Sequence, residues 1–306
     1  MASGSAVWET QCLNCGAALV GSFCAECGQR AVPPHPTVRE LAGDAISELS
    51  GWDGKFIETF RLLLRKPGEL TRQVLDGRRA RFISPVRLYL TLSVLYFIVA
   101  AAAPRVRSNP ATMEIGGISV GVFTPQVQKA SGAGQVARAV ADAQSGDLSK
   151  AQHDSALAQI AHAPALVRPI IRRAVDDPSG FRRSMLESMP RALFALVPVF
   201  AAILALFFRH RHYPEHLYLG LHLHAFIFLV LAVPQLLRFA RMPRLVAGAD
   251  VVVLSWIAVY AILSLRRVYG ESIGKTLIKA TGVGALYVLT AGAAMIALVY
   301  WAAITA

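Results

Sequence analysis

The sequence predicts a mainly α-helical, multi-pass membrane bundle of about five spans, with a small zinc ribbon at its N-terminal end. Of the 306 residues, 55% are hydrophobic and only 16% are charged, whereas soluble domains carry about 25% charged residues. The apolar residues are concentrated in a few long runs, and all four cysteines lie close together. The composition also excludes a disordered chain and a disulfide-rich miniprotein.

The first predicted domain, residues 1–30, contains two C-x2-C-G units, which begin at Cys12 and at Cys24. Each C-x2-C turn directs two thiolates at one metal ion, and four sulfurs complete a tetrahedron. The glycine after each pair supplies the positive φ that closes such a turn. We therefore expect one structural Zn2+ with no ligand position left for a catalytic water. Its ligands would be Cys12, Cys15, Cys24 and Cys27.

Two other interpretations of the cysteines are weaker. Two disulfides would need an oxidising compartment, and a dithiol redox pair usually lies on a βα unit, which this sequence does not show. A ribbon that binds nucleic acid would carry interleaved basic and aromatic residues, but this one has only Trp8, Phe23 and Arg30 nearby. Nucleic acid is therefore not the expected partner, and a cytoplasmic protein is the candidate.

Residues 31–84 are predicted to form a linker and juxtamembrane amphipathic helices. Pro33, Pro34 and Pro36 indicate a stiff linker, and Thr37 can cap a helix over residues 37–50. A second helix ends at Pro67-Gly68, and a short one follows near residues 69–76. The second helix would rest on the cytoplasmic membrane surface or pack on the ribbon. The residues Phe56, Phe60, Leu63 and Leu64 share one of its faces by helical spacing.

Five apolar stretches are long enough to cross a bilayer as helices. They are residues 85–103, 191–208, 217–237, 247–265 and 281–303, the last four forming a bundle within residues 191–306. The arginines that precede the first span predict a cytoplasmic N-terminus. The segments 209–216 and 266–280 then lie inside, and the loop 238–246 and the C-terminus lie outside. Residues 1–30 lack the apolar region of a signal peptide, so we expect the first span to be an uncleaved anchor.

Residues 104–190 are predicted to form an extracytoplasmic insertion that serves as a spacer or a partner-binding lobe. Within it, residues 114–122 are expected to form a small hairpin around Gly116-Gly117. Residues 164–189 are expected to form a helix that leads into the second span.

Histidines are concentrated before and within the third span, where residues 210–224 hold five of the eight. Ionisable residues inside a membrane are costly and indicate function. On one helix His222 and His224 point to nearly opposite sides, so other helices would have to contribute to any shared site. One interpretation is a second metal, haem or proton-relay site, and the other is a set of interhelical hydrogen bonds that fix packing. The residues concerned are Glu215, His216, His222 and His224.

No phosphate-binding loop, H-E-x-x-H motif or nucleophile elbow is present. We therefore expect a non-enzymatic membrane protein of unknown specific activity that recruits a partner or has a regulatory role. The alternative is a transporter or membrane enzyme that uses the Glu- and His-rich third span.

Several motifs together resemble one family. They are the two C-x2-C-G units with Gln29, then F-x2-T-x3-L-x3-P-G from Phe56 to Gly68, and G-x-R-x-R-[FY]-x-x-P from Gly77 to Pro85. This pattern, over about residues 10–97 and again at residues 213–216 and 221–226, resembles an uncharacterised bacterial zinc-ribbon membrane family, domain of unknown function 3667. The resemblance implies a cytoplasmic ribbon and several helices in the bacterial inner (plasma) membrane, and it implies no known activity.

Overall fold

The structure, a computed structural model, describes residues 10–31, 55–103, 112–115, 118–121, 168–240 and 243–305. The predicted linker, the helix predicted at 37–50 and most of the predicted insertion lie outside the described residues. The chain divides into two compact units. Unit 1 comprises Met1–Ile98, Val197–Pro234 and Ala247–Tyr287, and unit 2 comprises Val99–Leu196, Gln235–Val246 and Val288–Ala306.

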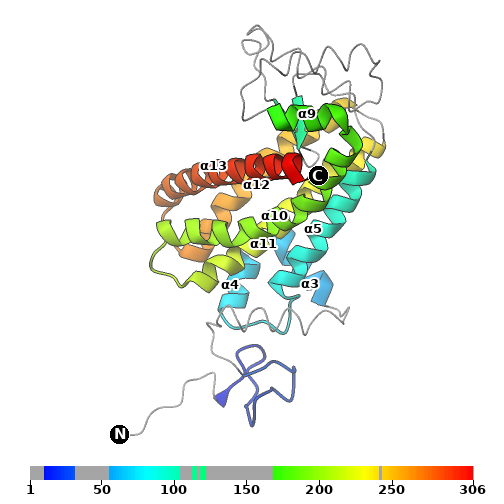
Figure 1. Cartoon of the computed structure of the whole chain (residues 1–306). Coiled ribbons are helices and arrows are strands. Elements are labelled where there is room, and N and C mark those ends of the chain that lie inside the picture. The colour runs from blue at the N-terminus through cyan, green and yellow to red at the C-terminus, as the bar shows by residue number, and fades with distance from the viewer. Residues whose placement is uncertain are drawn as a thin grey trace. The chain divides into compact units, whose positions relative to one another are not determined.

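The predicted class, a mainly helical membrane bundle, is confirmed (Figure 1). Among the described residues, four helices are long and apolar enough to cross a membrane: α5 (Pro85–Ala102), α11 (Tyr213–Phe239), α12 (Pro243–Tyr269) and α13 (Ile273–Thr305). The fifth expected span corresponds to Arg191–Phe207, the shorter apolar part of α10 (Pro178–Phe207). The helices α11, α12 and α13 extend beyond the predicted spans, and α13 is about 50 Å long at 1.5 Å per residue.

The helix ends follow local sequence signals. α5 begins at Pro85, where a missing N–H costs nothing, and the Arg87 N–H donates to the Ser84 hydroxyl at 3.4 Å. Gly270 ends α12 with a φ of 70°, and α13 begins three residues later.

Aromatic stacking holds the helices of unit 1 together. The rings of Phe226 in α11 and Tyr260 in α12 stack with centroids 3.5 Å apart. Phe208, which directly follows α10, stacks on Tyr269 of α12 at 3.9 Å. The ring of Phe200 in α10 meets that of Tyr287 in α13 edge to face at 4.9 Å. Because such pairs bury large apolar areas in a fixed geometry, they set the spacing between these helices.

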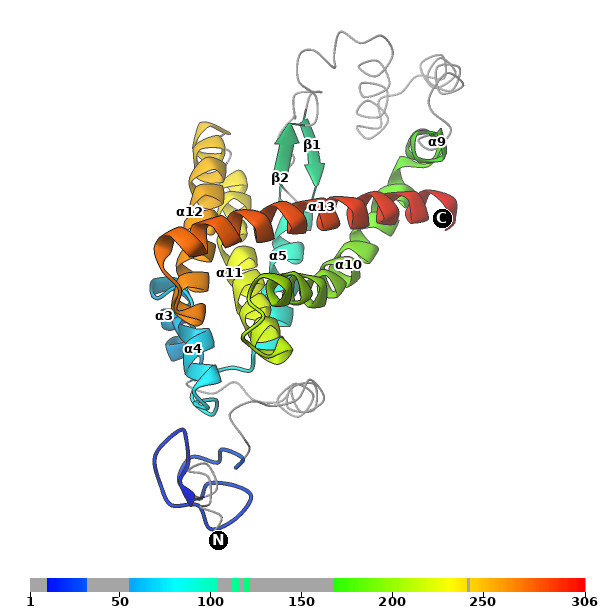
Figure 2. The same ribbon diagram turned by 90° about the vertical axis from the view of Figure 1, so that its left-hand side faces the viewer.

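Two short helices, α3 (Lys55–Arg65) and α4 (Glu69–Leu75), complete unit 1 (Figure 2). They match the predicted juxtamembrane helices closely. The α4 side chains Leu70, Thr71 and Val74 are fully buried. A helix of only seven residues is not stable by itself, so packing against the apolar helices is what stabilises α4.

Unit 2 contains the predicted hairpin. β1 (Thr112–Ile115) and β2 (Ile118–Gly121) pair antiparallel, with Ile115 opposite Ile118. The helix predicted at 164–189 is divided into α9 (Arg168–Asp176) and α10. The reason is local, because the Asp177 carboxylate accepts the Gly180 N–H at 2.9 Å and so caps a new helix that begins at Pro178.

Candidate metal centre and the segments around it

The cysteines lie on two similar turns. In the first turn the Gly16 N–H donates to the Cys12 carbonyl at 2.8 Å, and in the second the Gly28 N–H donates to the Cys24 carbonyl at 2.9 Å. Both glycines have the expected positive φ, 78° and 70°. Each turn is closed by a pair of residues in an isolated antiparallel bridge, Gln11 with Ala18 and Phe23 with Arg30. The repeated C-x2-C-G sequence therefore gives the same local structure twice.

The four sulfur atoms converge and could hold one metal ion. All lie within 4.8 Å of one another, with separations of 3.5 Å for Cys12–Cys27 and for Cys15–Cys24. A tetrahedral ion with bonds of about 2.3 Å needs sulfurs about 3.8 Å apart. No disulfide joins these cysteines. The spacing fits a closed four-sulfur site.

The thiols also perturb one another. A hydrogen bond from the Cys27 backbone N–H lowers the pKa of Cys24 to about 7. A bond to the Ala17 backbone lowers the pKa of Cys15, but desolvation and the three neighbouring thiols outweigh it and raise that pKa to about 12. Four thiolates this close repel one another. A bound cation would remove that repulsion and release the remaining protons.

Gln29 attaches the cysteine ribbon to the chain that enters α5. Its Nε2 donates to the Gly77 carbonyl at 2.8 Å, and its Oε1 accepts the N–H groups of Arg79 and Ala80, each at 3.0 Å. One side chain thus satisfies three backbone groups of the loop after α4. The glutamine of the C-x2-C-G-Q motif is therefore a structural connection.

Gly77 is required at this contact for two reasons. It ends α4 in a Schellman motif, in which the Arg78 N–H donates to the Gln73 carbonyl and the Gly77 N–H to the Val74 carbonyl. Its φ of 87° disfavours any residue with a Cβ. A Cβ at this position would also lie only 2.6 Å from the Leu13 side chain of the ribbon. The ribbon therefore packs directly on this glycine.

The turn between α3 and α4 packs against α12. Gly68 has a φ of 74°, and a Cβ there would lie 2.9 Å from the Ser264 backbone. The Arg267 guanidinium donates to the Pro67 carbonyl. The Tyr260 hydroxyl donates to the Leu63 carbonyl at 2.6 Å. The Pro67-Gly68 turn therefore packs directly against α12, and α3, this turn and α4 are called the α3–α4 hairpin below.

Thr59, the threonine of the same motif, joins α3 to the segment before α5. It is fully buried, and its Oγ1 accepts the Ile83 N–H at 3.1 Å while donating to the Lys55 carbonyl at 2.7 Å. The motif residues of this region therefore hold the hairpin, the ribbon and the start of α5 together.

The predicted apolar face of α3 is divided in the structure. Leu63 is buried at 1% exposure and faces the bundle, but Leu64 is 44% exposed. Phe56 and Phe60 stack on each other with ring centroids 4.5 Å apart and are half-buried. The four side chains therefore do not form one exposed face, because contacts with α12 and with the segment before α5 bury the Thr59–Leu63 side of the helix.

Each histidine of α11 bonds to a hydroxyl group from a different element. His216 Nδ1 lies 2.6 Å from the Tyr269 hydroxyl of α12 and His222 Nδ1 lies 2.9 Å from the Thr71 hydroxyl of α4. His224 Nε2 lies 2.7 Å from the Tyr287 hydroxyl of α13, and its Nδ1 lies 2.7 Å from the Gly220 carbonyl. Since a carbonyl only accepts, His224 Nδ1 carries a proton, and in the neutral imidazole Nε2 then accepts from the Tyr287 hydroxyl.

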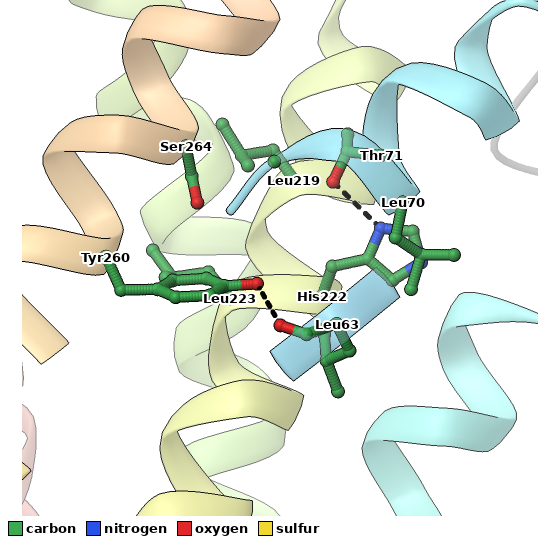
Figure 3. A pocket seen from close by; sticks show the side chains of 9 residues that line it. Leu63, Leu70, Thr71, Leu219, His222, Leu223, Tyr260 and Ser264 are labelled. Atoms are coloured by element: carbon green, nitrogen blue, oxygen red, sulfur yellow. Dashed lines mark hydrogen bonds between the residues drawn. The ribbon is translucent and has the colours of Figure 1, made fainter. Parts of the chain in front are cut away.

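His222 also borders a small cavity between α4, α11 and α12 (Figure 3). Thr71, Tyr260 and Ser264 line the same cavity, and the rest of the wall is largely leucine. Within the described part of the chain, His222 Nε2 has no hydrogen-bond partner.

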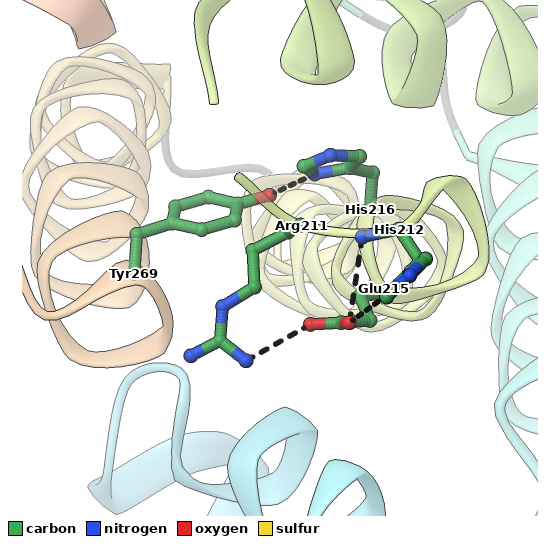
Figure 4. A network of polar contacts seen from close by, with 5 residues as sticks. All are labelled: Arg211, His212, Glu215, His216 and Tyr269. Carbon is green, nitrogen blue, oxygen red and sulfur yellow. Dashed lines mark hydrogen bonds and ion pairs between the residues drawn. The ribbon is translucent and has the colours of Figure 1, made fainter. Parts of the chain in front are cut away.

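Glu215 caps α11 (Figure 4). Its carboxylate accepts the His212 N–H at 3.4 Å and lies 3.2 Å from Arg211 Nη1. A carboxylate three residues into a helix that reaches back to the capping N–H is the reciprocal half of a capping box. Glu215 is only 3% exposed. The free-energy cost of burying its charge is offset by the Arg211 guanidinium and by the His212 N–H donor.

The structure does not bring the four candidates of the second site to one point. Among the described residues, the cysteines form the only group of three or more metal-ligand side chains close enough to share an ion. Sequence reasoning missed the partners Thr71, Tyr269 and Tyr287, and it missed the role of Gln29. Nothing in the local pattern distinguishes a tyrosine that bonds to a histidine from one that faces lipid.

The comparisons with known proteins support one of the predictions. Residues 53–97 match the family model described as protein of unknown function (DUF3667). The match covers α3, α4 and most of α5, and it confirms the resemblance seen in the sequence. No curated protein and no solved structure matches the chain.

Proposed function

We propose that this chain is a multi-pass protein of the bacterial inner membrane whose cytoplasmic zinc ribbon recruits or senses a cytoplasmic protein partner. The observation that carries the proposal is the attachment of the ribbon by Gln29 to the loop that enters α5. A ribbon held in this way is fixed relative to the first membrane helix. A force or movement from a partner bound to the ribbon would therefore reach α4 and the start of α5 directly.

Zinc is the proposed ion because four thiolates in tetrahedral geometry suit it best, and because the site leaves no open position for catalysis. The proposed ligands are Cys12, Cys15, Cys24 and Cys27. The described part of the ribbon is too small for a large apolar core, so the ion would supply most of its folding free energy.

The cytoplasmic orientation is supported by contacts within unit 1. Two segments predicted to lie inside, 209–216 and 266–280, come together there through the contact of His216 with Tyr269. Arg267 bonds to the turn after α3, Lys279 lies over the Phe208 ring at 4.6 Å, and Arg211 lies beside α11. Positive charges gathered at one end of several apolar helices indicate the cytoplasmic side.

The alternative, a transporter or membrane enzyme that uses α11, has less support. The three histidines take separate hydroxyl partners, and Glu215 caps a helix. Such contacts favour the other interpretation of these residues, in which interhelical hydrogen bonds fix the packing of the helices.

Metal analysis of the purified protein tests the site. We expect one zinc per chain, loss of zinc in Cys12→Ser/Cys15→Ser, and retention of zinc when His216, His222 and His224 are all changed to Ala. A second ion that disappears with the histidines would instead favour the alternative.

The recruiting role is tested by cross-linking in membranes followed by purification of the full chain. Cys12→Ser/Cys15→Ser and Gln29→Ala should lose protein partners that the wild type and a control, Gln11→Ala, retain. Gln11 is exposed and belongs to the same ribbon. An unchanged set of partners in the cysteine variant would contradict the role.

A further inference from the structure

The outward side of α3 has an unusual composition. Ile57, Arg61, Leu64 and Arg65 are all exposed, and at 100° per residue they fall within about 100° of arc. Ile57 is 79% exposed, although it is a large apolar side chain. From this face we propose that α3 binds the headgroups of anionic phospholipids, with Ile57 and Leu64 in the acyl boundary and the two arginines on lipid phosphates.

Contacts on the opposite side of α3 fix the level of this helix along α12, and so its depth in the membrane. Leu63 is bonded through its carbonyl to Tyr260, which lies nine residues before the end of α12. At 1.5 Å per residue this is about 13 Å along the helix. α3 therefore lies beside Gly248–Tyr269, the part of α12 that is long and apolar enough to cross a membrane, and not beyond its end. Its outward face then meets the boundary between headgroups and acyl chains.

The charges on this face are uncompensated. In the part of the chain that the structure describes, neither Arg61 nor Arg65 forms an ion pair. Glu58, the acidic residue of α3, is bound to Arg81 at 2.6 Å. Within the described residues, the face therefore offers two guanidinium groups that form no ion pair, interleaved with two apolar side chains.

Anionic lipid is the partner that fits this pattern. Interfacial helices bury apolar side chains at the acyl boundary and attract anionic headgroups with basic ones. Guanidinium groups match phosphate oxygens in charge and in geometry.

Native mass spectrometry of the purified full-length chain tests the proposal. Phosphatidylglycerol and phosphatidylcholine with identical acyl chains are added in equal amounts, and the bound lipids are counted. We expect the wild type to prefer phosphatidylglycerol and Arg61→Gln/Arg65→Gln to lower this preference at least tenfold. Arg61→Lys/Arg65→Lys should retain most of it.

The matched control is Arg266→Gln/Lys275→Gln, which removes two exposed positive charges, one from the last turn of α12 and one from the first turn of α13. It should keep the preference of the wild type. A second variant, Ile57→Ser/Leu64→Ser, should bind both lipids less well without changing their ratio. The proposal is overturned if the α3 arginine variant keeps the wild-type preference, or if the control loses as much.

Discussion

Gly68 lies where the backbone of the α3–α4 turn touches the backbone of α12. Its positive φ and the 2.9 Å that would separate a Cβ from Ser264 leave no room for a side chain. The two constraints have different origins, one in the turn itself and one in the packing. Together they explain why a Pro-Gly pair, and not simply a polar turn, stands at this position.

Gly68→Ala should therefore destabilise the protein by about 2 kcal/mol or more, because it combines left-handed strain with a backbone clash. Thermal unfolding of the detergent-solubilised protein measures the loss. Gly284→Ala is the control, since that glycine lies in α13 with open space around it, and its effect should stay within about 1 kcal/mol. Equal unfolding temperatures for the two variants would refute this account of the turn.

Gln29, like Gly68, has a role that a single substitution can test, because its side chain holds the ribbon on the loop after α4. Gln29→Ala should leave the metal in place and raise amide hydrogen exchange at Arg79 and Ala80, whose N–H groups lose their acceptor. Gln11→Ala should not alter exchange at those amides. If their protection is unchanged in Gln29→Ala, the ribbon is held by something other than this side chain.

At the scale of elements, α4 depends on its neighbours. The buried Thr71 hydroxyl of α4 bonds to His222 in α11. The turn before α4 bonds to α12 through the Pro67 carbonyl, which accepts from Arg267. Hydrogen bonds between membrane helices contribute about 0.6 kcal/mol on average. The hydrogen bond between Thr71 and His222 therefore mainly fixes the position of α4 against α11, and it adds little to the free energy of unfolding.

Thr71→Val should destabilise the protein by about 1 kcal/mol, because it removes the partner of a buried imidazole. Thr71→Val/His222→Leu should lose less than the sum of the single variants, since both polar groups are then absent. Thr281→Val is a suitable control, because that hydroxyl bonds within its own helix. Additive losses in the unfolding free energy would show that the two residues are not coupled.

The elements were largely predictable, and their partners were not. Apolar runs located α5, α11, α12 and α13, and the two C-x2-C-G units located the cysteine site, because each of these signals is local. The division of the apolar face of α3 was not predictable, because it depends on α12, about 200 residues away. The histidine pattern was recognised, but the hydroxyl groups that bond to it come from three other elements.

At the scale of the whole molecule, the ribbon and the helices are stabilised by different interactions. Removal of the proposed metal by a chelator should unfold the ribbon, since the ion would take the place of an apolar core there. The helices have their own aromatic contacts, so the helical circular dichroism should persist. The number of reactive thiols per chain should rise from none to four. A parallel loss of helical signal would mean that the helices depend on the metal.

The orientation of the chain gives a further prediction. Cysteines introduced at His210 and Ser272 should react with a membrane-impermeant maleimide only after the cells are permeabilised, and one introduced at Ala240 should react in intact cells. All three positions are exposed. The opposite result would invert the proposed topology and place the ribbon outside.

The hydroxyl partners of α11 also bear on how the protein is made. Thr71 precedes this helix in the chain, but Tyr269 and Tyr287 are synthesised after it. While the ribosome is still translating α12 and α13, two imidazoles of α11 have not yet met their native partners. The histidines of α11 can therefore reach their final pairing only once α13, which carries Tyr287, has been synthesised and packed.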